Sequence, residues 1–228
     1  MATQGTGSGE KKSRLTRERI LAAAEEMFAA RGYNNTSLRE LTAKAKVNLS
    51  VVYYYFESKE DLLLACVEKY LRPMLVRETA AIAALRERAN GNAIPLRDLI
   101  SALTHVRKFS SPETTQRFRS MVFSLTGRMS KKVFRACKEM MEVSRMQALG
   151  EFVRACPHLE SVEVCLRYAS MNAAIFGLQT FAQYLNKEFP KSIPESAYFE
   201  MFVSSMEALF AAPASYRGAS DGDPACLI

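Results

Sequence analysis

Apolar residues recur three and four positions apart along most of the chain, and we find no convincing run with the period of two that marks a half-buried strand. The pattern predicts an all-α protein with about nine helices. The fourth helix contains Pro73, which should kink it or break it. The expected helices span residues 14–31, 38–44, 49–56, 59 to beyond 70, 96–108, 113–126, 130–155, 161–188 and 195–211.

Capping residues locate the first four helices. Gly32 follows the first, as glycine often follows a helix end. Ser37 and Glu40 have the spacing of a capping box, in which each side chain accepts a hydrogen bond from the other residue's backbone. Asn48 is a suitable N-cap for the third helix, and Ser58 for the fourth. Three short helices with a tight turn between the second and third form a helix-turn-helix unit.

The third helix should have one buried face and one exposed face. Val52 and Phe56 lie four residues apart and should pack on the first two helices, with Val47 below them. Three successive tyrosines on so short a helix cannot all be buried, and tyrosine hydroxyls commonly donate to DNA phosphates. The alternative is an aromatic cluster that only joins the third helix to the fourth. The outward residues are Leu49, Ser50, Tyr53 and Tyr54, with Tyr55 at the boundary.

Positive charge is concentrated in the same part of the chain. Residues 11–59 contain ten Lys and Arg and five Glu, so they carry 10 − 5 = +5 of the formal net charge of +7. Such a concentration favours a polyanion-binding surface, although a merely solvated face has the same composition.

The segment 14–64 resembles the DNA-binding domain of the TetR family of transcriptional regulators. The resemblance rests on ILAAA at 20–24, FAARGY at 28–33, TSLREL at 36–41 and above all VYYYFESKEDL at 52–62. It implies an all-helical repressor that binds double-stranded DNA at an inverted-repeat operator. It also implies a homodimer formed by the last two helices and a small-molecule effector, of unknown identity, that releases the DNA.

The resemblance also assigns contacts, residue by residue. Ser37, Tyr53, Tyr54 and Lys59 would bind phosphates, with Tyr55 nearby, whereas Arg39, Leu49 and Ser50 would face bases or the groove wall.

Two residues depart from the family pattern. Lys46 stands in the turn where the family usually has glycine, and a positive φ there would cost on the order of 1 kcal/mol. Leu49 is apolar at a base-facing position. It could touch thymine methyl groups but could neither donate nor accept a hydrogen bond.

The last two helices favour a dimer interface over residues 161–211. The first of them carries small residues that would let another helix approach closely, and the last is apolar over more than one face. The alternative is that both helices are internal core.

A ligand pocket would lie in the C-terminal part, where eight of the eleven methionines fall between Met121 and Met206. Methionine adapts its shape to apolar ligands, although it more often only fills gaps in a core. Arg119 is a possible polar anchor. The candidate lining residues are His105, Phe109, Phe118, Met121, Phe123, Met140 and Phe176.

Other classes of function receive little support. The two histidines and five scattered cysteines form no metal-binding or nucleophilic pattern, so we expect no enzyme, metal or cofactor. We also expect no membrane span and no signal peptide, hence a cytoplasmic protein. A helix-turn-helix protein without an effector remains the alternative function.

These expectations divide the chain into four parts. Residues 1–12 would be a disordered arm, 13–58 the helix-turn-helix domain, 59–212 the ligand-binding and dimerisation domain, and 213–228 a flexible tail.

Overall fold

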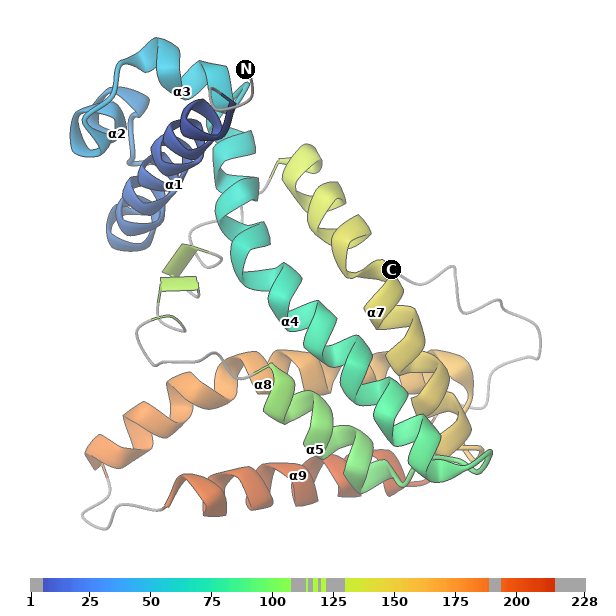
Figure 1. Cartoon of the computed structure of the whole chain (residues 1–228). Helices are drawn as coiled ribbons and strands as arrows, with labels where there is room; N and C mark the ends of the chain where they lie inside the picture. Colours follow the sequence, from blue (N-terminus) through green and yellow to red (C-terminus); the bar gives the residue numbers. More distant parts are fainter. Residues whose placement is uncertain are drawn as a thin grey trace. The chain divides into compact units, whose positions relative to one another are not determined.

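The computed structural model describes residues 6–107, 130–188 and 194–215, together with 114, 117, 118, 120 and 121. Its regular elements are all helices, which confirms the predicted fold class (Figure 1). They are α1 (Thr6–Arg31), α2 (Leu38–Ala45), α3 (Leu49–Tyr55), α4 (Lys59–Ala89), α5 (Leu96–Val106), α7 (Lys131–Ala155), α8 (Ser161–Glu188) and α9 (Glu195–Ala211).

The chain forms two compact units. The first comprises Met1–Pro73 with Phe109–Met141, and the second Met74–Lys108 with Glu142–Ile228. The expected boundary at residue 58 therefore differs from the observed division, because α4 and α7 each contribute to both units.

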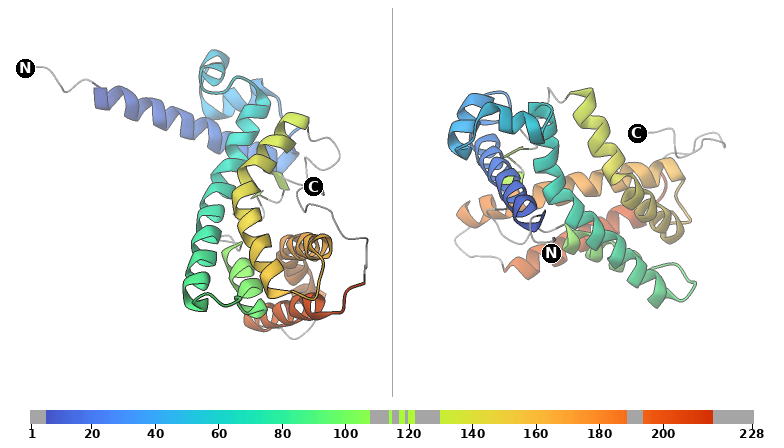
Figure 2. Two further views of the ribbon diagram at one scale, coloured as in Figure 1. Left: turned by 90° about the vertical axis from the view of Figure 1, so that its right-hand side faces the viewer. Right: turned by 45° about the horizontal axis from the view of Figure 1, so that its top comes forward.

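The first unit is organised by α1, α2, α3 and the start of α4. α1 packs on α2 and α2 on α3, and all three lie together in both views of Figure 2. Ile20, Phe28, Leu41, Leu62 and Leu63 are completely buried in its core. Each such side chain contributes about 1.5–3 kcal/mol of burial free energy.

The helices depart from the expectation in several places. α1 begins at Thr6, so residues 6–12 of the expected disordered arm are helical, and its first turns project beyond α2 and α3 (Figure 2). α3 ends at Tyr55, because Phe56 is extended with a φ of −141°. α4 continues through Pro73 without a break. The helix expected over 113–126 lies largely outside the described residues.

The second unit has its own apolar core, where α9 packs against both α5 and α8. Phe152 of α7 stacks on Phe210 of α9 with ring centroids 4.6 Å apart, and the ring of Tyr168 lies 5.5 Å from Phe152. All three rings are buried, so α7, α8 and α9 share this core.

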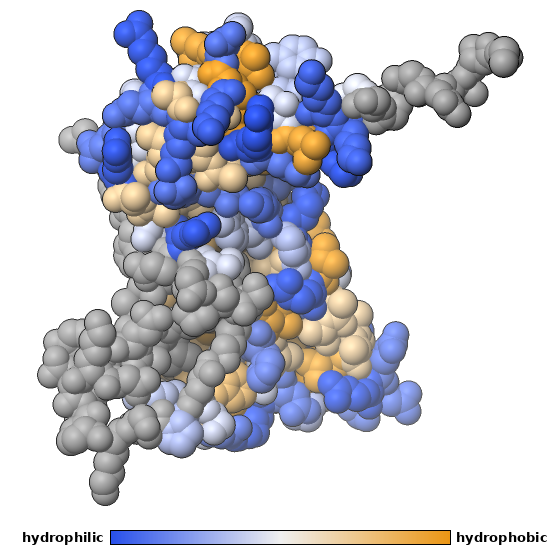
Figure 3. Space-filling model, turned by 60° about the vertical axis from the view of Figure 1, so that its left-hand side comes forward, coloured by the Kyte–Doolittle hydropathy of each residue, from blue (hydrophilic) through white to orange (hydrophobic). Residues whose placement is uncertain are grey.

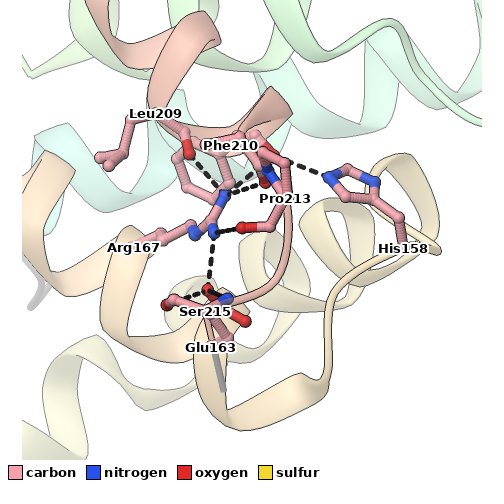
Figure 4. A network of polar contacts seen from close by, with 8 residues as sticks. His158, Glu163, Arg167, Leu209, Phe210, Pro213 and Ser215 are labelled. Carbon is pink, nitrogen blue, oxygen red and sulfur yellow. Dashed lines mark hydrogen bonds and ion pairs between the residues drawn. The ribbon is translucent and has the colours of Figure 1, made fainter. Parts of the chain in front are cut away.

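A single arginine of α8 holds the end of α9 (Figure 4). Nη1 of Arg167 donates to the carbonyl oxygens of Leu209 at 2.5 Å, Phe210 at 3.2 Å and Ala212 at 2.8 Å, and Nη2 donates to Pro213 at 3.0 Å. The last carbonyls of a helix have no partner within the helix, and a cation there also interacts favourably with the helix dipole. Arg167 therefore caps α9.

Glu163 completes this Arg167 clamp. Its Oε1 accepts from Nη2 of Arg167 at 2.6 Å and from the backbone N and the Oγ of Ser215 at 3.0 and 2.8 Å. The Ser215 backbone N–H, the Ser215 hydroxyl and Arg167 lower the pKa of Glu163 to about 2. Residues 213–215 of the expected flexible tail are thus held to α8, and 216–228 lie outside the described residues.

We expect Arg167→Met to destabilise the second unit by about 3–5 kcal/mol, because it leaves a buried carboxylate and several carbonyl oxygens without a donor. Urea denaturation followed by circular dichroism measures the loss. The control is Arg135→Met on α7, where Arg135 is exposed and forms only a weak pair with Glu139 at 4.0 Å. Equal urea midpoints for the two variants would contradict the clamp.

The clamp also predicts a pH dependence. The pKa of Glu163 falls on folding from its ordinary value of 4.5 to about 2, so its stabilising contribution is complete above pH 4.5 and is lost as pH falls towards 2. Glu163→Gln should flatten the stability profile within that window. Unfolding midpoints at several pH values test this, and parallel profiles for wild type and variant would disprove it.

Candidate nucleic-acid interface

The N-terminus of α2 is closed by the predicted capping box. Ser37 Oγ accepts from the Glu40 backbone N at 3.2 Å, and Glu40 Oε2 accepts from the Ser37 backbone N at 3.1 Å. Ser37 Oγ also lies 2.7 Å from Glu40 Oε2, and the hydrogen bonds from Ser37 lower the pKa of Glu40. Ser37 is exposed, as its predicted phosphate contact requires, but its hydroxyl already holds the cap.

Lys46 has a left-handed backbone conformation, the positive φ that was considered for it because the family usually has glycine there. Its φ is 52° and its ψ 49°, and its backbone N–H donates to the carbonyl of Ala43 at 3.2 Å. Asn48 follows as the N-cap residue of α3, but its side chain makes no capping hydrogen bond. The turn between α2 and α3 therefore contains an exposed lysine in a left-handed conformation and, two residues later, an amide side chain that does not cap the helix.

The two predicted faces of α3 are confirmed. Val52 and Phe56 are 1% and 4% exposed, whereas Tyr53 and Tyr54 are 51% and 79% exposed. The remaining outward residues, Leu49 and Ser50, are also exposed. The exposed face therefore consists of hydroxyl groups and one apolar side chain.

Tyr55 is half-buried at the edge of the exposed face, where the sequence placed it. Its hydroxyl donates to the carbonyl oxygen of Ser13 at 3.1 Å and lies 2.9 Å from Ser13 Oγ. The ring packs edge-on against Tyr54. Tyr55 thus ties α3 to α1, which is a structural role.

Two basic candidates lie beside α3 in the sequence. Arg39 is exposed on α2. Lys59 opens α4, and its Nζ lies 4.2 Å from the ring centroid of Tyr33. Partial burial lowers the pKa of Lys59. The aromatic ring holds this ammonium group in place beside the helix-turn-helix.

An open groove of about 810 Å³ runs between α1 and the turn that precedes α3. One wall is a single face of α1 that includes Lys12, Ser13 and Arg19, and the other includes Lys46 and Tyr54. Lys12 and Arg19 were not among the residues expected to bind DNA. Their spacing of seven places them on one helix face, which is the signal that could have found them. Hydrophilic side chains, with apolar ones between them, project from the helices of this unit (Figure 3).

The candidate pocket residues are divided between the two units. Phe118 and Met121 are buried in the first, where the ring of Phe118 lies 5.6 Å from that of Tyr70. Met140 is half-buried in the same unit, and Phe109 and Phe123 lie outside the described residues. In the second unit, His105 is exposed with its ring against Phe199, and Phe176 is half-buried. Their role in ligand binding stays a prediction.

The residues with described positions contain no cluster of His, Cys, Asp or Glu that could hold a metal ion, and none of their helices is long and apolar enough to cross a membrane. Cys66, Cys156 and Cys165 are buried free thiols, and burial raises the pKa of each.

Comparison with known proteins agrees with this geometry. Residues 20–66 match the family model described as "Bacterial regulatory proteins, tetR family". The HTH-type transcriptional repressor NicS of Pseudomonas putida is 35% identical over 68 residues, which cover 30% of this chain and 32% of NicS. The HTH-type transcriptional dual regulator CecR of Shigella flexneri is 42% identical over 57 residues, a quarter of each chain. Both likenesses therefore span about a third or less of these relatives.

The likeness in fold extends further. A tetR family transcription regulator from Shewanella sp. PV-4 superposes with a TM-score of 0.60 over 83% of this chain and 97% of its own, at 16% identity. At that identity the comparison establishes the fold alone.

We expect Lys46→Gly to stabilise the first unit by about 0.5–1 kcal/mol. Glycine adopts a left-handed conformation without the 1–2 kcal/mol cost of a Cβ, and its larger entropy loss on folding offsets part of that gain. Lys46→Ala is the matched control, because it removes the same charge and keeps the strain. Urea midpoints that rise equally in both variants, or in neither, would contradict this account.

Proposed function

Because the N-terminal segment of this chain belongs to the tetR family of bacterial regulatory proteins, we propose that the protein is a sequence-specific DNA-binding transcription regulator that acts in the cytoplasm. The observation that carries the proposal is the division of α3 into a buried face and an exposed face of hydroxyl groups. An α-helix fits the major groove of DNA, and the N-terminal residues of such a helix contact base edges.

The candidate contact residues divide by position into two groups. Tyr53 and Tyr54, later in α3, and Lys59, at the start of α4, would donate hydrogen bonds to phosphates, which sets the position of the helix on DNA. Ser50 and Leu49 lie in the first turn of α3 and would face bases. Arg39, which is exposed on α2, would also face bases or the groove wall. Ser37 and Tyr55 would act mainly by holding α2 and α3 in place.

The proposal includes a homodimer through residues 161–211. The exposed side of α8 carries Leu166, which is 67% exposed, followed by small residues, and α9 presents Met201, which is 60% exposed. A Cβ added at Gly177 would meet no atom within 4 Å, so the α8 surface is open there. Two copies of such a surface suit an isologous interface. A twofold dimer would read an inverted repeat with half-sites about 34–36 Å apart, or a multiple of that.

We also propose that the protein represses transcription and that a small-molecule ligand relieves this repression. NicS is named as a repressor and CecR as a dual regulator, and repression is the simpler mode for a dimer that covers an operator. The alternative is a DNA-binding protein without an effector. A thermal-shift screen of small apolar and aromatic compounds, followed by operator binding, separates the two. Compounds that raise the melting temperature and release DNA would support a small-molecule effector. If no compound has both effects, the alternative without an effector is supported.

We expect Tyr53→Phe and Lys59→Ala to weaken binding to every duplex by similar factors. Ser50→Ala should instead change the preference among operator variants by roughly 1–3 kcal/mol at the affected base pair. Fluorescence anisotropy with the operator, a mutated operator and random DNA measures both effects. If the tyrosine and lysine variants change specificity while Ser50→Ala acts uniformly, the roles on α3 are assigned wrongly.

We expect Ala173→Arg to convert the dimer into a monomer at micromolar concentration. A charge without a partner in an α8 interface costs about 3–5 kcal/mol, which weakens association about 100-fold or more. Ala80→Arg is the matched control on the exposed side of α4. Sedimentation velocity tests both, and a wild-type monomer of about 25.5 kDa would contradict the dimer.

A further inference from the structure

We propose that the groove between α1 and the α2–α3 turn binds the sugar-phosphate backbone of one DNA strand, with Lys12, Arg19 and Lys46 as its phosphate ligands. The inference rests on the proposed DNA-binding function and adds a second contact surface to it. The groove is continuous with the exposed face of α3, since Ser50 and Tyr54 also line it.

The shape of the groove suits an extended chain. Gly9, Lys12, Thr16 and Arg19 lie three or four residues apart and, with Ser13 next to Lys12, form one wall along more than two turns of α1. The turn 46–48 and the start of α3 form the opposite wall. The site is open to solvent along the helix, as a strand of duplex DNA requires.

The charges in the groove have no internal partner. None of the lining residues is acidic, and Lys12, Arg19 and Lys46 form no ion pair within the described residues. Other cations of the same unit are paired: Arg14 with Glu18 at 3.7 Å, Arg31 with Glu40 at 3.2 Å, Lys44 with Glu26 at 2.6 Å, and Lys69 with Glu25 at 2.7 Å. Three cations without a carboxylate partner, Lys12, Arg19 and Lys46, thus share one groove, where they attract a polyanion.

Lys46 is a second reason to assign a ligand here. Its left-handed backbone conformation favours glycine, so a lysine at this position lowers the stability of the folded protein. Asn48 beside it does not use its amide to cap α3, which leaves a donor for a phosphate oxygen.

The groove is also held in shape before any DNA binds. The hydrogen bond from Tyr55 to the Ser13 carbonyl joins the middle of one wall to the end of α3. The hydroxyl of Thr16 donates to the carbonyl oxygen of Lys12 at 2.9 Å. This hydrogen bond holds the Thr16 side chain on the face of α1 that lines the groove. A preformed site loses less conformational entropy on binding.

The test uses the full-length chain and two duplexes: an operator selected from a random library by the wild-type protein, and a random-sequence duplex of equal length. Lys12→Ala, Arg19→Ala, Lys46→Ala and Lys46→Gly should each weaken binding to both duplexes by similar factors. Each should also reduce the log–log salt slope by about 0.9 per lost phosphate contact in each subunit. Lys44→Ala and Arg14→Ala are matched controls, because these cations are already paired.

Lys46→Gly separates binding from folding. It should raise the urea midpoint and lower DNA affinity, whereas a purely structural lysine would give a variant with unchanged or improved affinity. If the groove variants keep the wild-type affinity and salt slope while Tyr53→Phe and Lys59→Ala lose affinity, the groove proposal is wrong and the proposed function stands. If the selection yields no duplex that the wild-type protein binds, and the random-sequence duplex is not bound either, both proposals are wrong.

Discussion

Burial of Val52 and Phe56 fixes the orientation of α3, and the rest of the proposed interface depends on that orientation. α3 has only seven residues, and a helix of that length is not stable alone in water. It exists because one face packs into the core of the first unit. Once that face is buried, Tyr53 and Tyr54 must point to solvent, so packing decides which side chains can meet DNA.

The ion pairs in the structure show more precisely than the composition which lysines and arginines are available to bind an anion. The segment 11–59 has a surplus of five positive charges, but several of its lysines and arginines are paired with glutamates on neighbouring turns or helices. Glu25 is buried and holds both Lys69 and the hydroxyl of Tyr70. The cations that stay available to a partner include Lys12, Arg19 and Lys46 along the groove, and Arg39 and Lys59 outside it.

Local signals allowed the sequence to predict much of the fold. The bounds of α8 and α9 were expected at the residues where they occur, and the capping box of α2 and the two faces of α3 follow from spacing alone. The sequence did not predict the start of α1, because Gly7 and Gly9 have low helix propensity. Extending an existing helix is nevertheless easier than nucleating one.

Contacts between distant residues could not be read from spacing. Tyr55 bonds to Ser13 across 42 residues, and Arg167 reaches carbonyls more than 40 residues away. Neither partner has a sequence motif that identifies the other. For the same reason the hydrogen bond between Tyr55 and Ser13 was not expected, and residues 213–215 were assigned to a flexible tail.

The central claim is that the first unit binds DNA through phosphate contacts around α3. The most direct test is the affinity of the wild-type protein for a duplex at several salt concentrations between 50 and 200 mM. Each phosphate neutralised contributes about −0.9 to the slope of log affinity against log salt, so several contacts per subunit predict a steep negative slope. A slope near zero over the same range would contradict the claim.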